Sequence, residues 1–189
     1  MARPRSEDKR RAILDAAMRV CADRGIADAP TAAIARSAGV AEGSLFTYFK
    51  TKHDLMNELY TELRLEFSQS LTDFPHRADA RTRLRYVWDR YIDLGLLYPE
   101  RLKVLAQLRA SGKLFKENEQ PSFVFIEVLK AIREVVRTGP LRTAPSEFLV
   151  LVLRAHAEET IDFINANPEN KDLCREMGFG MLWRGLAGR

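Results

Sequence analysis

The sequence predicts an all-α fold of about nine helices, divided into a small N-terminal three-helix unit and a larger helical remainder. Three observations lead to this fold class. Apolar residues recur with the 3.6-residue period of helices through most of the 189 residues, and no stretch shows the period of two that is typical of strands. Short segments with Gly or Pro separate these stretches. A compact helix corner is indicated near Gly39.

The first predicted helix begins at a Ser6 cap and ends at Gly25. One face of it is apolar, formed by Ile13, Ala16, Ala17, Val20 and Cys21. The preceding residues 1–5 are expected to form a flexible basic arm. Its Arg3 and Arg5 are candidates to reach phosphates or a minor groove.

The second predicted helix begins at a Thr31 cap and ends at Gly39, which can adopt the positive φ that a helix end requires. A third helix follows from Ala41, with Leu45 and Phe49 on its buried face. This spacing is typical of a helix-turn-helix, although ordinary helical proteins contain similar corners.

The opposite face of the third helix is small, polar or aromatic, which suits contact with base edges and phosphates in a major groove. It is formed by Glu42, Gly43, Ser44 and Thr47, with Tyr48 at its edge. The basic residues Lys50 and Lys52 follow at once and favour a DNA-binding function over an ordinary helical corner.

The distribution of charge agrees with that interpretation. Residues 1–53 hold ten Lys and Arg against six Asp and Glu, whereas residues 54–189 hold twenty of each. The whole net charge of +4 therefore falls in the first quarter of the chain. Such asymmetry indicates an N-terminal part that faces nucleic acid, since Lys and Arg neutralise phosphates, although a basic tail that only aids solubility would look the same.

A fourth helix, residues 52–71, is expected to connect residues 1–53 to a second domain, residues 72–189. Its cap is the Thr51 to Asp54 segment. Five more helices are predicted, with Pro99, Pro121 and Pro145 opening three of them and a polar connector at residues 113–120. The run 148–153 is apolar on every face and is expected to be buried all round.

The last helix carries Gly178, Gly180 and Gly185, which each cost about 1 kcal/mol relative to Ala unless close packing needs them. We expect the last two helices to form a four-helix homodimer interface, with an internal core as the alternative.

Two cysteines, Cys21 and Cys174, lie on apolar helical faces, so buried free thiols are expected in a reducing cytoplasm. No segment reaches the roughly 18 apolar residues of a membrane span, and no signal region is apparent. A single His156-x-x-Glu159 pair is too little for a di-iron bundle, and no motif of a phosphate loop, nucleophile elbow or zinc site is present. We therefore expect no catalysis, metal or cofactor.

These features resemble the TetR family of transcriptional repressors over residues 6–66. The resemblance is carried by Thr31-x-x-Ile34-Ala35-x-x-Ala38-Gly39-Val40 and by Gly43-x-Leu45-Phe46-x-Tyr48-Phe49-x-x-Lys52-x-x-Leu55. The opening MARPRSEDK, Trp88-x-x-Tyr91 and Glu159-Thr160-x-Asp162-Phe163 more weakly resemble the multidrug-sensing branch represented by RamR. Ala41 lacks the Ser cap common in the family, and Phe46 lacks the hydroxyl of the common Tyr.

The resemblance implies an N-terminal helix-turn-helix DNA-binding domain plus a C-terminal helical ligand-binding and dimerisation domain. It implies a homodimer whose DNA-facing residues are Thr31, Gly43, Ser44, Leu45, Tyr48 and Lys52. It also implies a pocket for a small-molecule effector, which we expect to be aromatic or cationic. The residues expected to line this pocket are Tyr60, Arg64, Trp88, Tyr91, Phe125, His156, Glu159 and Asp162. A plain aromatic core is the alternative.

The expected function is a ligand-responsive repressor that leaves a palindromic double-stranded DNA operator when its effector binds, with control of efflux as one role. The alternative is a helical dimer that acts as an architectural or partner-binding protein without an effector.

Overall fold

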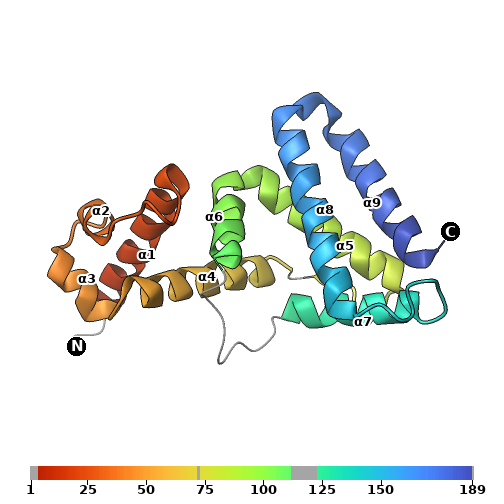
Figure 1. Cartoon of the computed structure of the whole chain (residues 1–189), viewed down its shortest axis with the longest axis horizontal. Helices are drawn as coiled ribbons and strands as arrows, with labels where there is room; N and C mark the ends of the chain where they lie inside the picture. Colours follow the sequence, from red (N-terminus) through yellow and green to blue (C-terminus); the bar gives the residue numbers. More distant parts are fainter. Residues whose placement is uncertain (1–3, 72, 112–122, 189) are drawn as a thin grey trace. The chain divides into compact units, whose positions relative to one another are not determined.

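The computed structural model describes residues 4–71, 73–111 and 123–188, and every regular element in these ranges is helical. The helices are α1 (Pro4–Arg24), α2 (Thr31–Ser37), α3 (Glu42–Tyr48), α4 (Lys52–Gln69), α5 (Ala80–Leu97), α6 (Pro99–Ala110), α7 (Phe123–Val136), α8 (Ser146–Ala166) and α9 (Lys171–Ala187), with a short 3-10 turn at Pro168–Asn170 (Figure 1). The all-helical prediction is therefore confirmed for the described ranges.

The chain divides into two compact units, which we call the N-terminal unit and the C-terminal unit. The N-terminal unit comprises residues 1–65 and 99–119, and the C-terminal unit comprises residues 66–98 and 120–189. These units follow packing, so α6 joins the N-terminal helices although it lies beyond α5 in the chain. The functional division into residues 1–53 and 72–189 stays a prediction.

Helix α1 begins earlier than the sequence indicates. It starts at Pro4, so Arg5 and Ser6 are helical, and the expectation that Ser6 caps the helix and that Arg5 belongs to a flexible arm is wrong. Proline is favoured at a first helical position because its fixed φ suits the helix and its missing N–H would have no partner there. At the other end Gly25 has a φ of +80°, which confirms the predicted stop.

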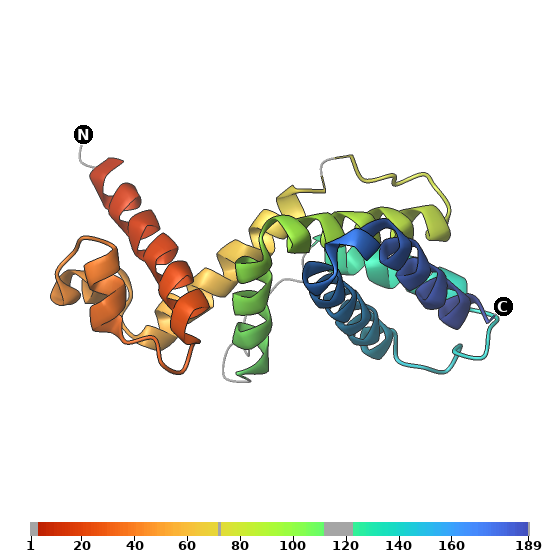
Figure 2. The same cartoon turned by 90° about the horizontal axis from the view of Figure 1, so that it is seen from above.

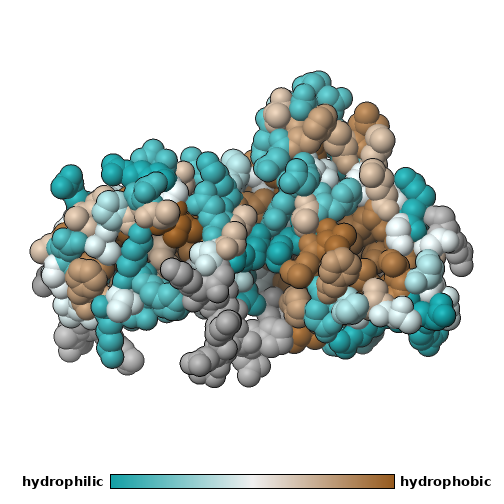
Figure 3. All heavy atoms as spheres, viewed as in Figure 1, coloured by the Kyte–Doolittle hydropathy of each residue, from teal (hydrophilic) through white to brown (hydrophobic). Residues whose placement is uncertain are grey.

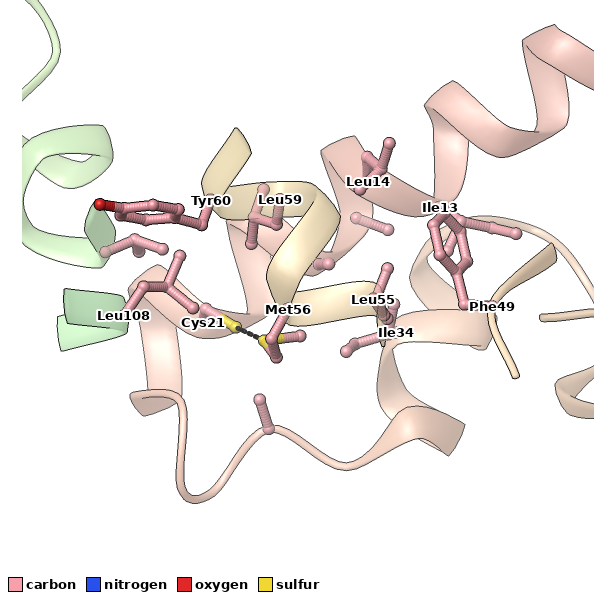
Figure 4. Packing of buried hydrophobic residues seen from close by; sticks show 14 of the residues in the cluster. Ile13, Leu14, Cys21, Ile34, Phe49, Leu55, Met56, Leu59, Tyr60 and Leu108 are labelled. Carbon is pink, nitrogen blue, oxygen red and sulfur yellow. Dashed lines mark hydrogen bonds between the residues drawn. The ribbon is translucent and has the colours of Figure 1, made fainter. Parts of the chain in front are cut away.

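The N-terminal unit is built around one hydrophobic core. In both views α2 and α3 lie side by side, with α2 against α1 (Figures 1 and 2). Figure 4 shows how Ile13 and Leu14 of α1, Ile34 of α2 and Leu55 of α4 point into this core. All four side chains are at most 1% exposed. Burial of this size, about 1.5–3 kcal/mol for each large side chain, fixes the short helices α2 and α3.

Helix α6 completes that core with Val104 and Leu108, both fully buried. It packs against α1. The sequence gives α6 an apolar stripe but no sign of which neighbour covers it, so its place in the N-terminal unit was not predicted.

Cys21 is the predicted buried thiol of α1. Its Sγ lies 3.8 Å from Met56 Sδ (Figure 4). Burial raises the pKa of Cys21 from 9.0 to about 11, although the nearby Lys52 charge lowers it in part. The thiol therefore stays protonated at neutral pH. Cys174 is a half-buried free thiol rather than a fully buried one.

In the C-terminal unit, α5 packs against α7, α8 and α9. Asp79 caps α5 by accepting a hydrogen bond from the Thr82 N–H at 2.8 Å. Hydrogen bonds from the backbone and the side chain of Thr82 lower the pKa of the Asp79 carboxyl. The core of the unit includes Trp88 and Ile92 of α5 and Ile161 of α8. Helix α7 is described from Phe123, and the predicted connector at 113–120 and the predicted start at Pro121 lie outside the described residues.

The glycines of α9 have different surroundings. A Cβ on Gly178 would lie 2.7 Å from the Trp88 ring, so close packing explains this glycine as predicted. A Cβ on Gly180 would meet only the Arg184 side chain of the same helix, and one on Gly185 would meet nothing within 4 Å. Contacts within this chain do not explain those two glycines, so close packing in a dimer interface stays a prediction for them.

The apolar run of α8 is not buried all round, contrary to the prediction. Phe148, Leu151 and Val152 are 57%, 48% and 47% exposed, because α5, α7 and α9 cover only part of the helix. Phe163 continues this exposed stripe on α8, and Leu173, Met177 and Met181 form a matching one on α9. We call these seven residues the apolar stripes. The largest hydrophobic area visible in Figure 3 lies on the C-terminal unit, where α8 runs in Figure 1.

Candidate nucleic-acid interface

The corner between α2 and α3 is a tight turn built by backbone hydrogen bonds. Gly39 has a φ of +68°, as predicted. Its N–H donates to the Arg36 carbonyl at 3.2 Å, and the Val40 N–H donates to the Ala35 carbonyl at 3.0 Å. Ala35 is 2% exposed, so its small side chain sits inside the corner. These contacts fix the direction in which α3 leaves α2.

One side of α3 is anchored in the N-terminal core. Leu45 is fully buried and Phe49, which follows the helix, is 4% exposed. This confirms the predicted buried face. It also corrects the inclusion of Leu45 among the DNA-facing residues, because a side chain with no exposed surface does not reach a base or a phosphate. Leu45 instead holds the helix that presents its neighbours.

The other side of α3 is open to solvent. Glu42, Gly43, Ser44 and Thr47 are exposed and Tyr48 is half-buried. The Thr47 hydroxyl donates to the Gly43 carbonyl of the preceding turn at 3.3 Å. Ala41 is the N-cap residue and makes no side-chain cap, as predicted. The structure thus brings the predicted α3 residues onto one exposed surface, which we call the α3 face.

Thr31 does not cap α2, contrary to the prediction. The N-cap is Pro30, and Thr31 is the first helical residue. Its hydroxyl instead donates to Glu42 Oε1 at 2.7 Å and so links the start of α2 to the start of α3. The sequence pattern predicts that both residues face DNA, but it does not indicate that they bind each other, since eleven positions separate them.

Lys50 and Lys52 occupy different environments. Lys50 is exposed. Lys52 is half-buried, and its Nζ donates to the Ile26 carbonyl at 3.0 Å and to the Ala27 carbonyl at 3.5 Å. The start of α4 therefore holds the loop between α1 and α2. A phosphate contact by Lys52 stays a prediction.

The same loop is held by a residue that the sequence did not single out. The Ile26 N–H donates to Gln107 Oε1 of α6 at 3.3 Å. A glutamine in an amphipathic helix carries no motif, so this contact could be found only from the structure. Of the predicted arm, Arg3 lies outside the described residues, and Arg5 is placed only as a helical residue.

The predicted effector residues of the C-terminal unit fall into separate groups. Trp88 is 4% exposed, its Nε1 donates to the Arg175 carbonyl at 3.1 Å, and its ring stacks on His156 at 5.4 Å. His156 Nε2 lies 2.9 Å from the Gly178 carbonyl, so it carries the proton of that hydrogen bond. Trp88 and His156 are thus brought together, but as packed core.

Tyr91 donates from Oη to Glu158 Oε1 at 2.7 Å and meets Phe67 edge-on at 5.0 Å. Phe125 is half-buried. Glu159 and Asp162 are exposed on α8 and are not brought to Trp88. In the N-terminal unit, the Arg64 guanidinium lies 5.2 Å from the centre of the Tyr60 ring.

Charged pairs that the sequence did not predict join α5 to α9. Arg85 of α5 donates to Glu176 of α9 at 2.8 Å, and Arg175 of α9 pairs with Asp93 of α5. Within α5, Arg85 also donates to Asp89 at 2.7 Å. The Arg85 guanidinium lowers the pKa of the Glu176 carboxyl, and Glu176 and Asp89 in turn raise the pKa of Arg85. The pairs between Arg85 and Glu176 and between Arg175 and Asp93 link α5 to α9 at a partly exposed surface.

Within the described ranges there is no group of three or more His, Cys, Asp or Glu that could hold a metal ion. A search of the same residues for a helix long and apolar enough to span a membrane found none.

Comparison with known proteins gives a family match and a sequence relative. The family model of the bacterial regulatory proteins, tetR family, matches residues 13–59. The fatty acid metabolism regulator protein of Bacillus subtilis (strain 168) is 33% identical over 97 residues, 51% of this chain. The match spans half the length of that relative, 50%.

Two solved structures share the fold. A TetR family transcription regulator of Marinobacter aquaeolei VT8 superposes with a TM-score of 0.80 at 23% identity and covers 96% of each chain. FadR from Bacillus subtilis in complex with stearoyl-CoA superposes with a TM-score of 0.64 at 20% identity, over 93% of this chain and 98% of that chain. The family model covers α3 and its flanking helices, so the α3 face belongs to the matched region.

Proposed function

Because this chain belongs to the TetR family of transcriptional regulators, we propose that it is a dimeric repressor that binds a palindromic operator through the α3 face. The observation that carries the proposal is the two-sided character of α3. Leu45 and Phe49 anchor it, while Glu42, Ser44 and Thr47 face solvent on an α-helix, an element that fits the width of a major groove. Charge supports the same assignment, since the whole excess of positive charge falls in residues 1–53.

We propose that the apolar stripes form the dimer interface. Met177 and Met181 on α9 are 55% and 57% exposed, and Phe163 on α8 is 52% exposed. Two adjacent helices with exposed apolar faces can pack on the same pair of a second copy as a four-helix bundle, which a two-fold axis makes self-complementary. A dimer would present two α3 faces to successive turns of the operator, about 34 Å apart or a multiple of it.

We propose that the C-terminal unit binds the effector that releases DNA. An aromatic or cationic effector is the first class, because Tyr91 and Phe125 are half-buried aromatic side chains in that unit. We propose control of efflux as the role that would match such an effector. A long-chain acyl-CoA is the second class, favoured by the 33% identity to the fatty acid metabolism regulator and by the fold shared with FadR in complex with stearoyl-CoA. The effector can release the protein from DNA only to the extent that it binds the state without DNA affinity more tightly than the DNA-binding state.

The test is selection of fragments from a random duplex library by the purified full chain, followed by mobility-shift titration of the best fragment. We expect a two-fold symmetric motif. To distinguish the two effector classes, stearoyl-CoA and an aromatic cation are each added to the preformed complex. Free DNA mixed with each compound is the control. Weak affinity without any motif would instead support the architectural or partner-binding alternative.

A further inference from the structure

We propose that Glu42 selects cytosine at one position of each operator half-site, held in place for this task by Thr31. The inference rests on the proposed function, because it assigns a base to one residue of the α3 face. It starts from the hydrogen bond between the Thr31 hydroxyl and Glu42 Oε1, 2.7 Å long, which ties the exposed carboxylate to the start of α2.

A carboxylate on a DNA-facing surface needs an explanation. Phosphates repel it, so it lowers affinity for every sequence unless a donor on the DNA meets it. Thr31 is the one hydrogen-bond partner that the described part of the chain provides for Glu42, and it engages Oε1. The second carboxylate oxygen, Oε2, is therefore left to accept from a ligand. A fixed rotamer also reduces the side-chain entropy that such a contact costs.

The edges of the bases in the major groove decide which ligand fits. An ionised carboxylate accepts hydrogen bonds and donates none. Guanine presents N7 and O6, which are acceptors, and thymine presents the O4 acceptor and a methyl group, so both are repelled. Adenine presents a donor beside the acceptor N7. Cytosine presents its N4 donor without an adjacent acceptor, so it is the base that a carboxylate at this place accepts best.

The position of Glu42 on α3 agrees with this role. In helix-turn-helix proteins the first residues of the recognition helix contact base edges, and Glu42 is the first helical residue of α3. The exposed neighbours Gly43 and Ser44 are small and leave room for the DNA to approach. Lys50, exposed beyond the end of α3, can meet phosphates, and phosphate contacts hold register but do not read sequence.

The variant that tests the proposal is Glu42→Gln. Glutamine keeps the length of the side chain and can still accept from the Thr31 hydroxyl, but it has lost the charge and gained a donor, which suits adenine N6 and N7. Glu169→Gln, at an exposed position between α8 and α9, makes the same change of net charge and serves as the matched control. Circular dichroism confirms that the variants are folded.

The full chain and both variants are used in parallel selections from a random duplex library, and the selected site is then titrated with each of the four base pairs at every position. We expect the wild type to lose affinity by on the order of tenfold when one cytosine per half-site is replaced. Glu42→Gln should lose that preference, favour adenine there and bind unrelated DNA more tightly at low salt. Glu169→Gln should behave as the wild type.

A second variant, Thr31→Val, removes the hydroxyl but keeps the shape, so discrimination at that one position should weaken while other positions stay unchanged. Identical base preferences in the wild type and Glu42→Gln would overturn the inference and leave the proposed function in place. Absence of any motif in the wild-type selection would overturn both together.

Discussion

The Trp88 ring of α5 occupies the space beside Gly178 of α9: a Cβ on this glycine would lie 2.7 Å from Cζ2 of the ring and 3.3 Å from the Thr160 hydroxyl oxygen. The indole nitrogen is fixed as well, since it donates to the Arg175 carbonyl on the same helix. Trp88 therefore sets how closely α9 approaches α5. The relationship explains why a helix so important to the proposed dimer carries a glycine at this point.

Gly178→Ala should destabilise the protein by about 1–3 kcal/mol, because the added methyl group meets a large ring that is held on several sides. Gly185→Ala is the control in the same helix. Nothing lies within 4 Å of its added Cβ, so it should be neutral or stabilise by up to about 1 kcal/mol. Urea unfolding of both variants measures the difference, and an equal effect would contradict the packing described here.

Variants of Lys50 and Lys52 should distinguish a lysine that only contacts DNA from one that also stabilises the fold. Lys50→Ala should make the negative slope of log affinity against log salt shallower by about 1. It should not alter stability, because Lys50 is exposed. Lys52→Ala should in addition cost about 1 kcal/mol of stability, since its ammonium no longer donates to the loop carbonyls of Ile26 and Ala27. Salt titrations and urea unfolding check both. Equal stability of the two variants would refute the structural role of Lys52.

The buried thiol of Cys21 should make stability depend on alkaline pH. Burial raises its pKa from 9.0 to about 11, so between these values the unfolded chain loses the proton while the folded chain keeps it. Stability contributed by the protonated thiol is full below pH 9 and falls as the pH rises toward 11. Cys21→Ala should show a shallower fall in urea unfolding over this range. A slope that does not change would mean that the thiol is accessible to solvent.

The fold and the α3 face were largely predictable because they depend on local patterns. Gly39, the apolar period of α2 and the pair Leu45 and Phe49 are each read within a few residues. The Thr31–Glu42 bond and the Gln107 contact were not predictable, since they join residues that lie near each other only after folding. Sequence spacing likewise does not tell whether an aromatic residue lines a pocket or packs as core, and Trp88 packs as core.

The exposed apolar run of α8 shows a further limit. Hydrophobicity on every face predicts burial, but it does not say whether the chain itself or a second copy provides the cover. Phe148 is 57% exposed, so the chain itself covers less than half of this side chain.

Met177→Glu should convert the proposed dimer into a monomer of 21.6 kDa. It places a charge in the middle of the α9 stripe, where a partner helix would have to desolvate it. Leu97→Glu is the control, because Leu97 is an exposed apolar residue of α5, outside the apolar stripes, and 66% exposed. Sedimentation equilibrium gives the masses. A dimer that persists in the Met177 variant, or one lost in the Leu97 variant, would exclude this interface.

In the proposed complex, α3 lies in the major groove of a specific site. The measurement that tests it most directly is photo-cross-linking from a single cysteine in a chain lacking Cys21 and Cys174. The probe is placed at Thr47 on the α3 face or at the exposed Thr143 of the C-terminal unit. We expect cross-links from position 47 to bases within the selected motif and none from position 143. Bases cross-linked from position 143, with none from position 47, would contradict the account.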